Sequence, residues 1–158
     1  GSFLTGLAGH HPERDFLGVE RLLGRARKSY RKACRADLKN LKVLRLEIAY
    51  ALEWLLPDSC ASRIHLLFPD PWPKKKHHKR RLLDEGFFEE ALRVLEVSGR
   101  LWIATDHDDY FEAILEGLEA AVERFTLVEA VWDGATTNYE DKFGSLGSTI
   151  HRRVLEKR

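Results

Sequence analysis

The sequence has little of what marks an exported, membrane-bound or metal-binding protein. Its two cysteines, Cys34 and Cys60, form neither a metal-binding nor a redox spacing, and no apolar run is long enough to span a bilayer. No signal-peptide pattern is present. His77 and His78 are neighbours that point in different directions, which disfavours a zinc site. We therefore expect no metal, no membrane partner and a reducing cytoplasm as the compartment.

Neither sign of charge dominates the composition. Lys and Arg number 26 against 25 Asp and Glu, so the formal net charge is only +1. Nucleic acid would therefore meet a local patch and not a uniformly basic protein. The length of 158 residues and the 44% hydrophobic content fit one domain with a real core, which excludes a disordered tail.

Hydrophobic patterns predict strands alternating with helices. This alternation is typical of βαβ architecture, so we expect an α/β fold with a mostly parallel sheet. Two late alternating runs predict an antiparallel edge, with a long polar loop over residues 134–148 between them. The predicted strands are 15–20, 41–47, 63–68, 100–105, 126–132 and 150–156, and the predicted helices are 22–38, 50–56, 83–95 and 109–125.

Four predicted strands end in an acidic residue: Glu20, Glu47, Asp70 and Asp106. One such acid would mean little, because caps and turns favour acids. Ligands of open α/β sheets bind at the carboxyl ends of strands, so four acids there predict an acidic cleft. Glu20 has the position from which Rossmann-like folds bind ribose hydroxyls, although a solvated carboxylate is an equal alternative.

Residues 64–81 combine a strand, one carboxylate and a cation cluster. The apolar run at 64–68 predicts a strand covered on both faces. Prolines on both sides of Asp70 exclude ladder and helix, and they hold this carboxylate in a stiff extended loop. The cations from Lys74 to Arg81 would hold a polyanion beside it, although charge runs are usually solvated faces.

The polar loop carries Thr137, Asn138, Tyr139 and Glu140, which offer two hydroxyls, an amide and a carboxylate. Such a set suits the edge of a nucleic-acid base, and a turn without a ligand is the alternative. The chain opens as if halfway through a strand, glycine loop, helix unit. An α/β domain without its first strand would expose two sheet edges, so we expect further residues before Gly1.

In this order, the motifs resemble those of the bacterial tRNA (guanine-N7)-methyltransferase family from Gly1 almost to the C-terminus. Gly1 resembles the last glycine of the family's cofactor loop, and residues 16–20 resemble its second strand. Ala104-Thr105-Asp106 and residues 137–140 resemble two substrate segments. The most specific match is Phe68-Pro69-Asp70-Pro71-Trp72 followed by Lys74, His77 and Lys79-Arg80-Arg81.

The resemblance implies one Rossmann-like methyltransferase domain over 1–158, incomplete at its N-terminus. It would transfer a methyl group from S-adenosylmethionine to N7 of guanine at position 46 in the variable loop of tRNA, with no obligatory protein partner. Asp70 would be catalytic and also close to the cofactor, which Gly1, Glu20 and Glu47 would bind. The substrate would contact Lys74, Asp106, Thr137, Asn138, Tyr139 and Glu140, and its phosphates would contact Lys79, Arg80 and Arg81.

Two other classes of protein fit parts of the pattern. A nicotinamide dehydrogenase would explain Glu20 but neither the prolines nor the basic run. A non-catalytic RNA-binding domain on a Rossmann-like fold would explain the basic run but not four acids at strand ends.

Overall fold

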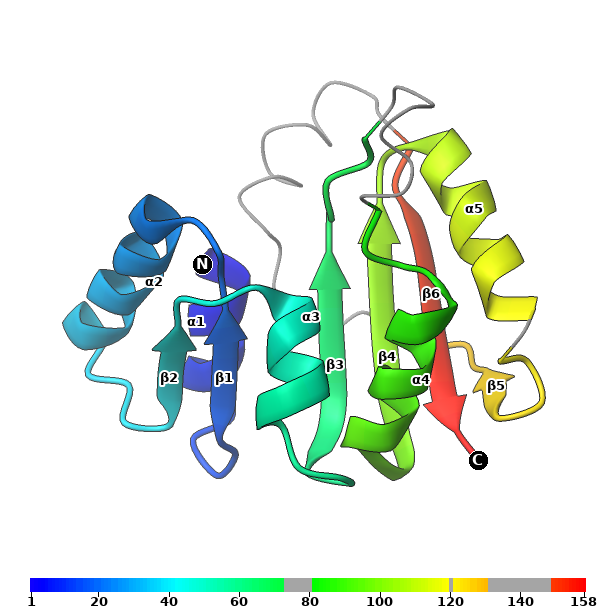
Figure 1. The fold of residues 1–158 in the computed structure, drawn as a ribbon. Coiled ribbons are helices and arrows are strands. Elements are labelled where there is room, and N and C mark those ends of the chain that lie inside the picture. Colours follow the sequence, from blue (N-terminus) through cyan, green and yellow to red (C-terminus); the bar gives the residue numbers. More distant parts are fainter. Residues whose placement is uncertain (73–80, 120, 131–148) are drawn as a thin grey trace. The chain divides into compact units, whose positions relative to one another are not determined.

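The computed structural model describes residues 1–72, 81–119, 121–130 and 149–158 (Figure 1). They form two compact units, one containing Gly1–Ala51 and the other containing Leu52–Ala130 and Thr149–Arg158. Strands alternate with helices in both units. The predicted α/β class is therefore confirmed, and each unit is described by itself.

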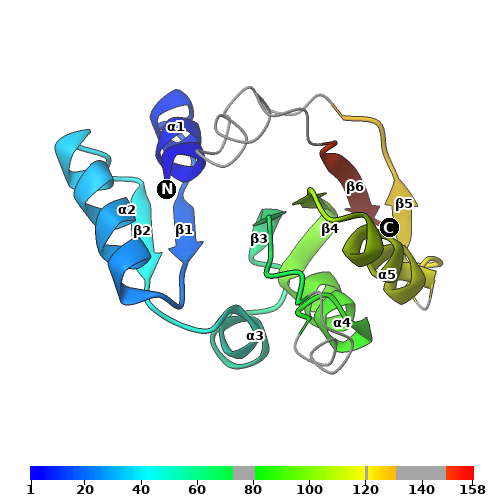
Figure 2. The same cartoon turned by 90° about the horizontal axis from the view of Figure 1, so that it is seen from above.

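The first unit is built on a pair of parallel strands. β1 (Phe16–Val19) pairs with β2 (Leu41–Leu44) over all four residues of each strand. α1 (Ser2–His10) packs on β1, and α2 (Leu23–Arg35) packs on β2 and on α1 (Figure 2). Gly18 permits this close packing, since a Cβ atom there would lie 2.4 Å from Cδ2 of Leu4.

The predicted strand at 41–47 is too long, because β2 ends at Leu44. Glu47 instead lies at the N-cap of the short helix α3 (Ile48–Tyr50), which continues as the π-helical turn η1 (Ala51–Leu55). The Leu46 amide adds one more bond to the ladder by donating to the Glu20 carbonyl at 3.2 Å, and the chain then turns into α3. Glu47 therefore follows the strand end by three residues.

Asn40 joins three segments of the first unit. Its Nδ2 lies 3.0 Å from the carbonyl oxygens of Ala8 and His11 and 2.9 Å from that of Arg14. Its own carbonyl accepts from the Phe16 amide at 2.7 Å, which starts the β1–β2 ladder. One amide side chain therefore satisfies the end of α1 and the loop to β1 together.

The second unit contains a four-stranded sheet in the order β3-β4-β6-β5. β3 and β4 are parallel, whereas β6 is antiparallel to both β4 and β5, so the predicted antiparallel edge is confirmed. α4 and α5 lie on the same face of this sheet (Figures 1 and 2). The bounds are β3 Ala61–Leu67, α4 Glu85–Val94, β4 Leu95–Thr105, α5 Asp108–Glu119, β5 Phe125–Leu127 and β6 His151–Lys157.

β4 is the core strand of this unit. Its residues from Leu101 to Ala104 are at most 1% exposed, with β3 and β6 on its two sides and α4 and α5 on one of its faces. The charged pair Arg100 and Glu156 closes one end of the β4–β6 register at 2.8 Å. β4 therefore contributes a continuous buried apolar segment to the core of the unit.

β4 begins at Leu95, directly after α4, and not at residue 100 as predicted. The β3–β4 register shifts between its pairs Ala61↔Leu95 and Arg63↔Arg100. Ser98 has a φ of 64°, and a Cβ on the buried Gly99 would lie 2.8 Å from the Glu96 carbonyl oxygen. Gly99 thus serves an irregularity in the strand.

β3 is half-buried along most of its length and not covered on both faces as predicted. The reason is its place at the end of the sheet: among the described residues, β3 pairs only with β4, and β1 pairs only with β2.

Two predicted elements are shorter in the structure. The predicted strand 126–132 is confirmed only as Phe125–Leu127, and α5 ends at Glu119. No helix in the described ranges is long and apolar enough to cross a membrane.

We predict that Asn40→Ala lowers the free energy of unfolding of the first unit by about 1–2 kcal/mol, because the partly buried carbonyls of Ala8 and His11 lose their donor. Asn40→Asp keeps the shape but cannot donate, so it should destabilise at least as much. Urea unfolding followed by circular dichroism measures both. Lys39→Ala is the neighbouring control, since Lys39 is 84% exposed and pairs only with exposed Asp37. Equal stability of the Asn40→Ala and control variants would contradict the role of Asn40.

Candidate functional site at the strand ends

Two of the predicted acids lie at one edge of the second unit's sheet. The parallel register pairs Leu67 with Ala104, and the Phe68 amide extends the ladder by donating to the Ala104 carbonyl at 2.8 Å. Asp70 follows β3 and Asp106 follows β4, so both leave the sheet at its carboxyl edge. Asp70 is exposed and Asp106 is half-buried. The two residues predicted for catalysis and substrate binding thus follow neighbouring strands at the same edge of the sheet.

The backbone around Asp70 turns sharply at both ends of its proline frame. Phe68 has a φ of 52° and Trp72 a φ of 44°, in the left-handed region that residues other than glycine rarely adopt. Each such residue costs on the order of 1–3 kcal/mol and persists only where the surroundings impose it. Sequence reasoning predicted the stiff loop from its prolines but not these two reversals.

Arg81 supplies one of the interactions that hold this frame. Its Nε donates to the Pro71 carbonyl at 2.9 Å, and its guanidinium pairs with the Asp109 carboxylate. The same group lies 4.9 Å from the centre of the Tyr110 ring. The side chain is only 8% exposed, so the structure gives Arg81 a positioning role in place of the predicted phosphate contact.

Tyr110 lies against the Arg81 guanidinium and is fully buried. Its hydroxyl oxygen accepts from the Leu83 amide at 3.3 Å. Burial raises the pKa of the Tyr110 phenol, because the phenolate would lose its hydration. Hydrogen bonds from the backbone of Leu83 and Leu82 and the charge of Arg81 oppose this rise in pKa without cancelling it.

Asp106 lies in a turn that caps α5. The buried Thr105 hydroxyl accepts from the His107 amide at 3.3 Å, and Nδ1 of His107 accepts from the Tyr110 amide at 3.3 Å. Asp108 and Asp109 occupy the first turn, where acids favour the helix dipole. Sequence reasoning missed His107 as a cap, although the acid-rich first turn that follows it was a visible signal of a helix start.

In the first unit, Glu20 and Glu47 lie near the carboxyl edge of the β1–β2 pair. The Glu20 amide donates to the Leu44 carbonyl at 3.0 Å, and its carboxylate Oε1 accepts from the Leu22 amide at 2.8 Å. Glu47 pairs with Arg21 at 3.3 Å, with both side chains exposed. The Leu22 amide therefore orients one oxygen of the Glu20 carboxylate, and no hydrogen bond from the described residues reaches the other oxygen.

Gly1 forms the N-cap of α1 and lies against α2. A Cβ at this position would lie 2.6 Å from the Ser29 hydroxyl oxygen, so the close approach requires glycine.

The other predicted site residues, Lys74, Lys79, Arg80 and residues 137–140, lie outside the described residues. The prediction that four acids share one cleft spans both units and stays a prediction. No group of residues suited to a metal ion occurs in the part of the chain that the structure describes.

Solved structures of methyltransferases have the same fold. The antibiotic-resistance methyltransferase Kmr superimposes with a TM-score of 0.61 at 16% identity, covering 98% of this chain and 81% of Kmr. A Streptococcus mutans protein described as a "putative methyltransferase" and solved in complex with SAH gives a TM-score of 0.58 at 13% identity, with 91% and 76% coverage. The fold is therefore that of a Rossmann-like methyltransferase.

Sequence comparison is more specific. The family described as "Putative methyltransferase" matches residues 1–153. The tRNA (guanine-N(7)-)-methyltransferase of Mycoplasma pneumoniae is 36% identical over 98% of this chain and 79% of its own length. That of Thermotoga maritima is 33% identical over 99% of this chain, which spans only 51% of that relative. The chain belongs to the tRNA (guanine-N7)-methyltransferase family.

We predict that Arg81→Lys destabilises the second unit by about 1–2 kcal/mol, because lysine keeps the charge but loses the planar fork that reaches Pro71 and stacks on Tyr110. Thermal unfolding measures the effect. Arg100→Lys is the matched control: its Nε also donates to an oxygen, on Glu156, but the side chain is 39% exposed and its loss should be smaller. A larger loss of stability in Arg100→Lys than in Arg81→Lys would contradict the role of Arg81 in holding the loop around Asp70.

The raised pKa of Tyr110 predicts a loss of stability at alkaline pH. The folded phenol holds its proton more tightly than the unfolded one, so this contribution is complete below about pH 10 and is lost as pH rises through the folded pKa. Tyr110→Phe should reduce the slope of unfolding free energy against pH in that range. Tyr50→Phe, at an exposed tyrosine, is the control, and equal slopes in the two variants would contradict the assignment.

Proposed function

We propose that this chain transfers a methyl group from S-adenosylmethionine to N7 of a guanine in the variable loop of tRNA. The observation that carries the proposal is the placement of Asp70 and Asp106 at one sheet edge, in a chain of this family. The SAH in a structurally similar protein supports the choice of cofactor. A tRNA substrate, named for the relatives, would place the reaction in the cytoplasm.

The cofactor supplies a methyl group on a positively charged sulfur. Guanine N7 has a free lone pair, so the protein needs no strong base, and its main task is to align the reacting atoms. Transfer of the methyl group from sulfur to N7 would leave the positive charge on the guanine ring. The carboxylates of Asp70 and Asp106 would stabilise that charge and accept from the N1 and N2 hydrogens of the base. Arg81 would act on the reaction only by holding the Pro71 carbonyl, next to Asp70.

The acids of the first unit fit the cofactor. Glu20 has one carboxylate oxygen fixed by the Leu22 amide, so its second oxygen is oriented for a ribose hydroxyl. Glu47 is exposed, and Arg21 balances its charge, which suits a neutral adenine edge. Gly1 lies so close to Ser29 that a side chain would not fit there. The cofactor-binding roles of Gly1, Glu20 and Glu47 are those that the sequence resemblance implies.

The remaining assignments rest on sequence. We propose that Lys74 and residues Thr137 to Glu140 contact the guanine and its surroundings, and that Lys79 and Arg80 contact phosphates. A nicotinamide dehydrogenase is not favoured by any of the comparisons. A non-catalytic RNA-binding domain is the alternative that the experiment below excludes. We expect the reaction to need no second protein.

We predict that Asp70→Asn lowers the single-turnover rate of tRNA methylation by roughly 100-fold, because an amide keeps the size but loses the charge that would stabilise the ring cation. The measurement uses purified full-length protein, labelled cofactor and unmodified tRNA, with the methylated base identified by mass spectrometry. Glu123→Gln removes one exposed carboxylate from the same unit and serves as the control.

Cofactor affinity is measured in the same variants, so that a binding defect is separated from a defect in transfer. Unchanged transfer in Asp70→Asn would remove this residue from the mechanism. A wild-type protein that binds tRNA but transfers no methyl group would favour the RNA-binding alternative.

A further inference from the structure

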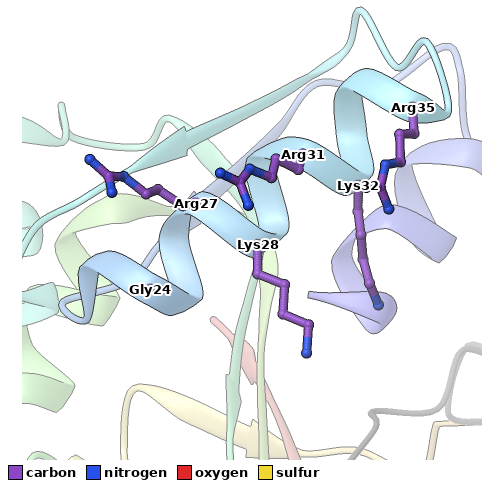
Figure 3. A pocket seen from close by; sticks show the side chains of 6 residues that line it. All are labelled: Gly24, Arg27, Lys28, Arg31, Lys32 and Arg35. Atoms are coloured by element: carbon purple, nitrogen blue, oxygen red, sulfur yellow. The ribbon is translucent and has the colours of Figure 1, made fainter.

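Helix α2 carries a dense set of cations to which the proposed reaction gives no role. Its thirteen residues include six Lys or Arg and no Asp or Glu. Five of these cations line an open groove of about 490 Å³ (Figure 3). We call these five residues the α2 row: Arg27, Lys28, Arg31, Lys32 and Arg35.

The α2 row follows one side of the helix. Arg27, Arg31 and Arg35 recur every four residues, and Lys28 and Lys32 form a second line beside them. Residues four apart are neighbours on a helix surface, and the span from Arg27 to Arg35 is about 12 Å at the usual rise per residue. Figure 3 shows the heads of Arg27 and Arg31 extending toward the N-terminal end of the helix. The span of about 12 Å from Arg27 to Arg35 is longer than a small anion and suits a chain of negative charges.

The charges of the α2 row are not neutralised by described neighbours. Several cations elsewhere in the described chain have carboxylate partners, as Arg14 has Glu13 and Lys39 has Asp37. None of the five residues forms an ion pair with a described carboxylate. Like charges four residues apart destabilise a helix. An external polyanion would relieve this repulsion.

The other side of α2 faces its own unit. Ala26 and Ala33 are buried there, and the helix packs on β2 and α1. No large apolar face is therefore left for insertion into a membrane. Tyr30, in contrast, is 62% exposed next to Arg31 and offers a ring on which a base can stack. Arginine in three of the five positions suits bidentate contacts with phosphate.

We propose that the α2 row binds the phosphate backbone of the tRNA, as an anchoring surface additional to Lys79 and Arg80. The identity of the RNA rests on the proposed function, whereas binding of a phosphate backbone does not. Phosphate contacts position a substrate without reading its sequence. The row would thus raise affinity for tRNA as a whole and not select the target guanine.

The test replaces Arg27, Arg31 and Arg35 together by glutamine, which preserves helix propensity. Binding of tRNA to the full-length protein is measured without cofactor over a range of salt concentrations. The log-log slope of affinity against salt should become flatter by about two to three units, roughly one per lost contact. In turnover assays, the KM for tRNA should rise while kcat at saturating tRNA stays unchanged.

Two further variants make the result specific. Arg14, Lys39 and Arg124, each replaced by glutamine, remove the same total charge from exposed residues that have carboxylate partners. This control should leave the slope nearly unchanged. Lysine at positions 27, 31 and 35 keeps the charge, so this variant should recover most of the salt dependence of tRNA binding. If the arginines had only a structural role, lysine would not restore that dependence. Circular dichroism checks that all variants are folded.

Equal salt slopes in the glutamine variant and the control would overturn the proposal and leave the α2 row a solvated face. Binding to vesicles of phosphatidylcholine and phosphatidylserine is measured as well. If the glutamine variant lost binding to these vesicles but kept its binding to tRNA, the proposal would be overturned in favour of a membrane surface. Failure of the proposed function is separate, since it would show as absent methyl transfer in wild-type protein whatever the slope of binding.

Discussion

The parallel pairing of β3 with β4 is the constraint on which the second unit depends. β4 is buried along its central residues and carries β3 on one side and β6 on the other. Because parallel strands end at the same edge, this pairing also decides that Asp70 and Asp106 leave the sheet together. Core packing and placement of the candidate site are therefore consequences of one register. A shift of that register would move both at once.

The loop that carries Asp70 combines stiffness with strain. Its prolines restrict the backbone, while Phe68 and Trp72 adopt left-handed conformations that cost free energy. Arg81 offsets part of this cost by joining the Pro71 carbonyl to Asp109 and Tyr110. The carboxylate is thus exposed at the end of a frame anchored in buried residues. Such an arrangement preorganises a charge, which is what stabilisation of a transient cation requires.

A net charge near zero conceals a strong separation of charge along the chain. Carboxylates collect at the ends of parallel strands, where a cofactor and a developing positive charge would be held. Cations collect on α2 and in the run after Asp70, which suits a phosphate backbone. Because the overall charge is balanced, binding of a nucleic acid would be confined to these surfaces.

The sequence alone determined the order of strands and helices, the acids at strand ends and the family, because short apolar runs, prolines and ordered motifs are local signals. Only the tertiary structure decided which cations bind protein and which face solvent. Arg81 and Arg80 are neighbours in a basic run, yet burial against Tyr110 makes Arg81 a clamp. Asn40 and Gly99 likewise serve contacts between segments distant along the chain. Such roles depend on long-range packing, which no local pattern of residues specifies.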